Sequence, residues 1–100
     1  MAQFDVYPGP GAGAEFLVDL QDAMLEELVT RVVAPLAPAA DVGPPMRILN
    51  PVVQVDDRSY VLQLHLLAAI PARHLGKPVA SIKSRRKEII AGIDLLFTGI

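Results

Sequence analysis

Apolar and polar residues alternate in two short segments near the start of the chain. The sequence QFDVY, residues 3–7, has the two-residue period that is typical of a half-buried strand. EFLVDLQ, residues 15–21, has the same period, which places Phe16 and Val18 on one face. The intervening PGPGAGA, residues 8–14, is predicted to be a loop, because proline lacks an amide proton and glycine is costly to order. The two strands are expected to form a hairpin.

The next segment, DAMLEELVTRVV at residues 22–33, supports two interpretations. Its first part is rich in residues that favour helix, and its apolar residues follow helical spacing. These apolar residues are Met24, Leu25, Leu28, Val29 and Val32. From Thr30 onward, however, TRVVAPL has a β-branched run that ends at Pro35, so it would serve equally well as a strand. The local pattern leaves helix and strand open.

The middle of the chain predicts one clear hairpin between two irregular segments. PVVQVDDRSYVLQLHLL, residues 51–67, contains two alternating runs that meet at a polar junction, residues 56–59. The proline-rich residues 37–51 are predicted to form a surface loop, and residues 68–78 a further irregular segment.

From about Ser84 the pattern becomes helical. Ser84 can cap the helix, and Gly99 fits the position that follows a helix end. An apolar stripe at i, i+4, i+7 and i+8 is formed by Ile89, Ile93, Leu96 and Phe97. Gly92 lies in the middle of this helix, where glycine costs about 1 kcal/mol relative to alanine. A close backbone approach, for example to the same helix of a second subunit, would explain Gly92, and so would a weak position that the fold tolerates.

Composition restricts the class of protein. With 100 residues, 52% of them hydrophobic and 20% charged, the chain is expected to fold as one globular domain, residues 1–100. It contains no cysteine, which excludes disulfide bonds, a thiolate nucleophile and cysteine metal sites. No apolar run approaches the roughly 18 residues of a membrane helix, so we expect a cytoplasmic protein without membrane contact.

The net charge of -2 is unevenly distributed. Six acidic residues precede Arg31, whereas six basic residues gather towards the other end: Arg73, Lys77, Lys83, Arg85, Arg86 and Lys87. Aromatic residues that would stack on bases are not interleaved with them, so direct nucleic-acid binding is not expected. A solvated helix start is the commoner reason for such a cluster. Positive charge in a first helical turn opposes the helix dipole, however, which favours an external acidic partner.

No group of residues predicts catalysis, a cofactor or a metal site. His65 is predicted to lie in a strand, pointing outward or hydrogen-bonded, and His74 in a solvated loop. Asp56 and Asp57 have the composition of a turn, and no further carboxylates stand at the spacing of a calcium loop. The glycines of residues 9–13 lie between two strands rather than before a helix, so they do not form a phosphate loop. The protein is not expected to be an enzyme.

Four segments in order resemble the CcdB toxins of bacterial toxin-antitoxin modules over the whole chain. They are FLVDLQ, RVVAPLA, NPVVQVDDRSYVL and the terminal IDLLFTGI. The resemblance implies a mainly β fold with a C-terminal α-helix: an SH3-like small barrel of the CcdB/MazF toxin type, with an antiparallel sheet and a small second sheet, in a homodimer. It also assigns residues 22–28 to a loop and residues 29–36 to a strand.

The family's toxins bind the A subunit of DNA gyrase and trap the gyrase-DNA cleavage complex, and a CcdA-like antitoxin, which is disordered alone, releases gyrase. Carried over by position, the gyrase-facing residues are Met24, Leu25, Asp94, Phe97, Thr98, Gly99 and Ile100. The antitoxin-binding residues are Pro8, Gly9, Pro10, Gly11, Arg73 and Lys77. Gly92 and Leu96 are expected at the dimer interface.

The chain departs from the family pattern at the implied site. Thr98 stands where well-known toxic members have tryptophan, and Asp94 replaces an asparagine. The loop of residues 8–14 has no basic residue, although in the family this loop can help receive the acidic antitoxin. Three hypotheses therefore stay open: a gyrase poison, a nontoxic protein that keeps the antitoxin site, and a ribonuclease toxin on the same barrel.

Overall fold

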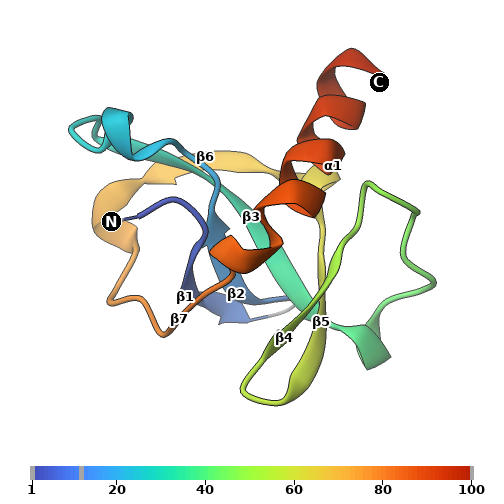
Figure 1. The fold of residues 1–100 in the computed structure, drawn as a ribbon. Coiled ribbons are helices and arrows are strands. Elements are labelled where there is room, and N and C mark those ends of the chain that lie inside the picture. Colours follow the sequence, from blue (N-terminus) through green and yellow to red (C-terminus); the bar gives the residue numbers. More distant parts are fainter. Residues whose placement is uncertain (1, 12, 100) are drawn as a thin grey trace.

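The computed structural model describes residues 2–11 and 13–99 (Figure 1). Within these residues the chain forms an antiparallel sheet of seven strands and one α-helix. The strands are β1 (Asp5–Gly11), β2 (Ala14–Asp19), β3 (Thr30–Pro38), β4 (Val52–Val55), β5 (Arg58–Leu62), β6 (Ala68–Pro71) and β7 (Ala80–Ser81), and the helix is α1 (Arg86–Thr98). Short 3₁₀ helices connect them: η1 (Ala23–Leu25), η2 (Ala39–Asp41), η3 (Leu64–Leu66), η4 (Ala72–His74) and η5 (Lys83–Arg85).

β3 organises the sheet, whose strand order is β4-β5-β3-β2-β1-β7. Leu36 of β3 pairs with both β2 and β5, and Val33 pairs with both β2 and β6. β5 and β6 therefore share one edge of β3, with β6 along its first half and β5 along its second. The described strands thus form one sheet, so the separate small second sheet implied by the resemblance is not present among them.

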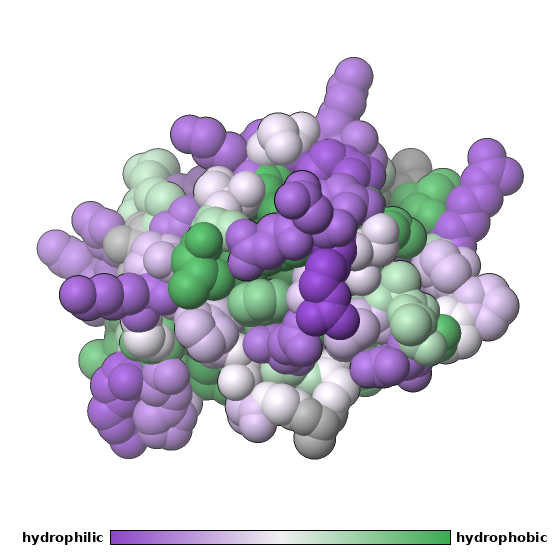
Figure 2. Space-filling model, turned by 90° about the horizontal axis from the view of Figure 1, so that it is seen from below, coloured by the Kyte–Doolittle hydropathy of each residue, from purple (hydrophilic) through white to green (hydrophobic). Residues whose placement is uncertain are grey.

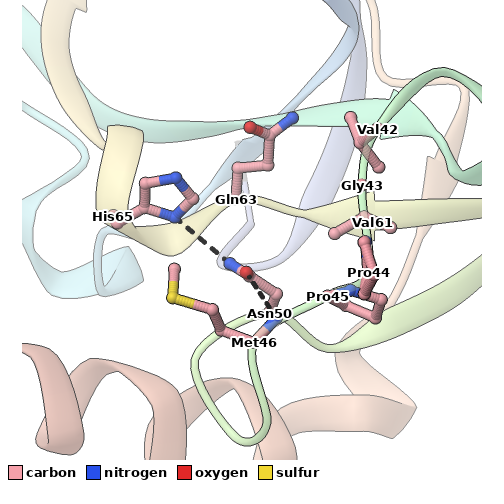
Figure 3. Close-up of a pocket in the computed structure, with 9 residues that line it drawn as sticks. All are labelled: Val42, Gly43, Pro44, Pro45, Met46, Asn50, Val61, Gln63 and His65. Atoms are coloured by element: carbon pink, nitrogen blue, oxygen red, sulfur yellow. Dashed lines mark hydrogen bonds between the residues drawn. The ribbon is translucent and has the colours of Figure 1, made fainter.

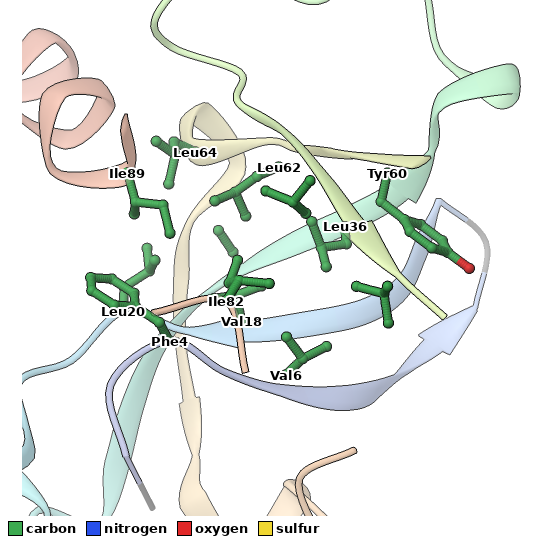
Figure 4. Close-up of a cluster of buried hydrophobic side chains, with 13 residues drawn as sticks. Phe4, Val6, Val18, Leu20, Leu36, Tyr60, Leu62, Leu64, Ile82 and Ile89 are labelled. Atoms are coloured by element: carbon green, nitrogen blue, oxygen red, sulfur yellow. The ribbon is translucent and has the colours of Figure 1, made fainter. Parts of the chain in front are cut away.

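The main core lies inside the curled sheet and is mostly aliphatic (Figure 4). Phe16, Val18 and Leu20 all face it, as their alternation predicts. α1 contributes Ile89, which is fully buried. A second, smaller cluster on the opposite face of the sheet contains Tyr7, Val33 and Leu75, so residues from the segment after β6 cover that face.

The predicted loop at residues 8–14 is wrong for most of its length. β1 continues through Pro8 and Pro10 to Gly11, and β2 begins at Ala14, while Ala12 lies outside the described residues. β1 pairs with β7 only at Asp5 and Val6. Beyond Val6, β1 pairs only with β2 among the described strands, so its other edge forms no hydrogen bonds to a strand. Proline is tolerated in such an edge strand, because its missing N–H is not needed there.

The helical interpretation of residues 22–33 is wrong, and the strand interpretation is confirmed. Only η1 is helical there, and β3 begins at Thr30. Most of the stability of a helix in a protein comes from packing its apolar face on the core, and every residue from 22 to 30 is exposed, so that packing is missing here. A strand instead satisfies its backbone by pairing with β2, β5 and β6, so tertiary context overrides helix propensity.

The central hairpin is confirmed, but it is shorter than predicted. Asp56 and Asp57 form the two-residue turn between β4 and β5, with positive φ values of 51° and 64°, the left-handed pattern that matches the twist of a hairpin. β5 ends at Leu62, so His65 lies in η3 and not in a strand. The segment predicted to be irregular after it contains β6.

α1 begins at Arg86, two residues later than Ser84, and its N-cap residue Arg85 makes no capping bond with its side chain. The predicted Ser84 cap is therefore wrong. Gly99 ends the helix as predicted, with φ 74° and its N–H donating to Leu95 O at 3.0 Å. The expected close approach at Gly92 is present, but to the same chain: an added Cβ would overlap Leu64 and lie 2.9 Å from Ile48 O. Gly92 therefore needs no second subunit to explain it.

Candidate functional site: the helix end and the β2–β3 loop

The apolar stripe of α1 leaves the core before the helix ends. Ile89 is fully buried and Ile93 partly buried, whereas Leu96 is 36% and Phe97 67% exposed. In Figure 1 the last turns of α1 project away from the sheet, with the C-terminal end far from the β4–β5 hairpin. The helix thus presents an aromatic ring that packs into no core cluster of the described residues.

Local hydrogen bonds fix the shape of this helix end. The hydroxyl of Thr98 donates to Asp94 O at 2.7 Å, and Gly99 N–H donates to Leu95 O. Asp94, Phe97, Thr98 and Gly99 are all exposed, and helical spacing places Asp94 next to Phe97 and Thr98. Of the terminal residues implied by the resemblance, these four form one surface, and Ile100 lies outside the described residues.

The second part of the implied gyrase site is the β2–β3 loop, residues 20–29. Met24 is 90% exposed and Leu25 48% exposed, and Leu28 and Val29 of the same loop are exposed as well. Sequence reasoning did not include Leu28 and Val29 in the site. The sequence MLEELV, residues 24–29, could have indicated them: if this segment is not a helix, its apolar side chains have no core to pack against and are expected at the surface.

The two parts do not meet within one chain. In Figure 1 η1 and the C-terminal end of α1 stand well apart. The face opposite the helix end, seen in Figure 2, is mostly hydrophilic with scattered apolar areas. A partner that contacts both parts must therefore span them, or meet them on two different chains.

Three of the six residues implied in antitoxin binding line one groove of about 310 Å³. Pro8, Gly9 and Pro10 of β1 line it together with Leu17, Ile70 and His74. Arg73 precedes His74 in η4, and Lys77 follows shortly after, both with exposed side chains. Gly11 is exposed at the end of β1. Two segments far apart in the sequence thus form one apolar groove with basic residues beside it.

A separate cavity of about 200 Å³ contains His65 and Asn50 (Figure 3). Asn50 Oδ1 accepts from Met46 N at 3.0 Å, and its Nδ2 lies 3.2 Å from His65 Nδ1 and 3.4 Å from Leu62 O. Because Met46 N fixes the orientation of the amide, Asn50 donates to His65. The pair holds the 42–50 loop to η3. Among the described residues no hydrogen bond or ion pair joins His65 to a carboxylate.

Two basic residues at the start of α1 have partners within the chain. Arg85 lies 3.5 Å from Glu88 and donates to Val52 O at 2.9 Å. Arg86 donates to Gln3 Oε1 at 3.3 Å and lies over the ring of Phe4. The expectation that this turn serves an external acid more than internal contacts is therefore wrong for these two arginines.

A family model described as CcdB protein matches residues 3–99. The chain belongs to the CcdB family. It is therefore a toxin-type component of a toxin-antitoxin module, and its mainly β fold with one C-terminal helix agrees with that family. In residues 2–11 and 13–99, no helix is long and apolar enough to cross a membrane. Across the same residues, no three histidine, aspartate or glutamate side chains are grouped as metal ligands would be.

Proposed function

We propose that this CcdB-family protein binds the A subunit of DNA gyrase as a homodimer and traps the gyrase-DNA cleavage complex. The observation that carries the proposal is the exposed Phe97 on a projecting helix end whose backbone is fixed by Gly99. Burying a phenylalanine side chain contributes about 2 kcal/mol. Binding alone is sufficient, because a ligand that favours one state of its target shifts the target toward that state.

A dimer would present each part of the surface twice. Two-fold symmetry places the same patch on both subunits, so Leu96 and Phe97 of two chains can form one continuous apolar surface. Leu96 is the proposed dimer contact, since Gly92 is buried against its own chain. Met24 and Leu25 would flank that surface. The proposed place of action is the cytoplasm, where gyrase meets DNA.

The groove beside β1 is the proposed site for the antitoxin. Its floor of Pro8, Leu17 and Ile70 offers apolar contacts, and Arg73 and Lys77 offer charge. A disordered acidic segment with interspersed apolar residues would complement both features, and it would become ordered on binding.

A second function, antitoxin binding without poisoning, is favoured by the helix end itself. The Thr98 hydroxyl donates to Asp94 O, so its proton is not offered to a target. Asp94 presents a carboxylate in place of an uncharged amide and would repel an acidic target surface.

A DNA cleavage assay with gyrase tests the proposal. The intact protein is compared with Phe97→Ser and with a control, Val79→Ser, which removes a similarly exposed apolar side chain elsewhere. We expect the intact protein and the control to accumulate cleaved DNA, and Phe97→Ser to lose this effect while remaining folded. If the intact protein traps no cleaved DNA yet binds an antitoxin, the second function is correct.

A further inference from the structure

Residues 22–29 of the β2–β3 loop show their apolar side chains to solvent, and none of these side chains lies in the core. Residues 22–30 are all exposed, and the residues on either side, Gln21 and Arg31, are buried. A segment without buried apolar contacts is usually among the least stable parts of a protein. The conformation of this loop must therefore depend on its backbone hydrogen bonds.

The buried Gln21 side chain binds the backbone in the middle of the loop and at the start of β3. Its Nε2 donates to Leu25 O at 3.0 Å and to Thr30 O at 3.3 Å. Its Oε1 accepts from Val32 N at 3.2 Å. The backbone N–H of Gln21 in turn donates to Asp19 Oδ1 at 2.9 Å. One carboxamide thus connects η1 to the start of β3, and its own position is set by a fully buried carboxylate.

Arg31 binds the next carbonyl of the loop. Its side chain is 1% exposed, and Nη2 donates to Glu26 O at 2.9 Å. Asp19 pairs in register with Val33, so Asp19 and Arg31 lie on the same face of neighbouring strands. Burial raises the pKa of Asp19 above its ordinary value, and the hydrogen bond from Gln21 N–H and the Arg31 charge lower it by less.

Filling a buried site with the polar and charged side chains of Asp19, Gln21 and Arg31 costs folding free energy. Buried charges lose their hydration, and apolar residues of similar size often stabilise a fold as well or better. In this protein the buried polar side chains bind the carbonyls of Leu25 and Glu26. The backbone of the loop is thereby held, while the side chains of Met24 and Leu25 stay exposed.

We propose that Gln21 and Arg31 are positioning residues that hold the β2–β3 loop in a shape ready to bind the apolar surface of a protein target. The inference rests on the proposed function for the identity of that target. A loop that is ordered before binding avoids the entropy cost of being ordered by its partner. Neither residue touches the partner, yet both determine how tightly Met24 and Leu25 bind it.

Hydrogen exchange of the free protein tests the positioning directly. Gln21→Met keeps the length of the side chain and removes its hydrogen bonds. We expect the amides of Leu25, Glu26 and Leu28, which bond within the loop, to exchange roughly five- to tenfold faster, as expected for one or two lost hydrogen bonds. The Val32 amide should also exchange faster, because it donates to Gln21 Oε1, whereas the amides of β5 and of β3 beyond Val32 should keep their protection. Unchanged exchange in the loop would overturn the proposal.

Binding to purified gyrase A subunit supplies the second measurement. We expect Gln21→Met to weaken binding by about tenfold, and to add little when Met24→Ser and Leu25→Ser are already present, because the positioned side chains are then absent. An additive loss would show that Gln21 acts elsewhere and would overturn the proposal.

A second variant and the use of both hydrogen exchange and gyrase binding distinguish misfolding, loss of positioning and failure of the proposed function. If Gln21→Met does not fold, Arg31→Lys retains the charge but not the planar donor set. It should speed exchange at Glu26 and Leu28, and protection equal to the wild type would count against the proposal. If the unmodified protein does not bind gyrase, the proposed function fails, whereas loop exchange still decides whether Gln21 and Arg31 position the loop.

Discussion

Replacing Gly92 by alanine separates two reasons for a glycine in the middle of α1. In the structure an added Cβ would overlap Leu64 Cδ1 and lie 2.9 Å from Ile48 O and 3.6 Å from Leu49 O. Leu64 is fully buried, so its side chain has little room to move, and the two oxygens belong to the backbone of a neighbouring loop. The substitution should therefore push α1 away from that loop.

The expected magnitude is the difference between two opposing effects. Alanine gains about 1 kcal/mol of helix propensity over glycine. Overpacking a well-filled site costs about 1 to 3 kcal/mol, and the overlap at Gly92 favours the upper half of that range. The net loss of unfolding free energy is then about 1 to 2 kcal/mol. For a domain of this size, 1 kcal/mol lowers Tm by about 4 to 8 °C.

Urea unfolding of Gly92→Ala measures this loss, and Gly76→Ala is the matched control. Gly76 has no atom within 4 Å of the added Cβ and has no positive φ. The control should be neutral or stabilised by up to about 1 kcal/mol. A Gly92→Ala protein as stable as the wild type would refute the close approach. If its stability instead became strongly dependent on protein concentration, the glycine would serve a contact between subunits.

Three further substitutions test other parts of the structure. Asp57→Gly relieves a left-handed residue in the β4–β5 turn and should raise the unfolding free energy by about 0.5 to 1 kcal/mol in urea unfolding; an Asp57→Val protein of equal stability would contradict the turn geometry. Burial raises the pKa of Asp19 in the folded state, so the folded protein binds more protons and stability should fall as pH rises from about 4, near the ordinary carboxyl pKa, through the raised value. Urea midpoints measured across this range should lose that slope in Asp19→Asn, and an identical slope would contradict the assignment. Ser84→Ala should change the unfolding free energy in urea by less than about 0.5 kcal/mol, because Ser84 does not cap α1; a loss near 1 kcal/mol would restore its capping role.

Patterns that depend on neighbouring residues could be read from the sequence. The β4–β5 hairpin follows from alternation around Asp56 and Asp57, and the end of α1 follows from Gly99. In each case the determining interaction lies within a few positions of the residue, so the local pattern contains it.

Other features depend on what lies across the sheet. β6 and the proline-containing end of β1 were predicted as irregular, because their strand character comes from pairing with β3 and β2. Gln21 and Arg31 gave no site signal either. A polar residue in a strand usually faces water, and only the folded chain shows that these two are buried against the loop they hold.

By itself, the sequence determined the alternation in β2, β4, β5 and the start of β1, the turn chemistry, the helix with its glycine stop, and a motif order that resembles CcdB. The tertiary structure decided which apolar residues remain outside. Met24 and Phe97 have the same hydrophobic character as Val18 or Ile89 in any local pattern, yet the first two are exposed and the other two fully buried. Burial depends on contacts between segments far apart in the chain. Only the folded protein therefore separates the residues that stabilise it from those that are free to bind a partner.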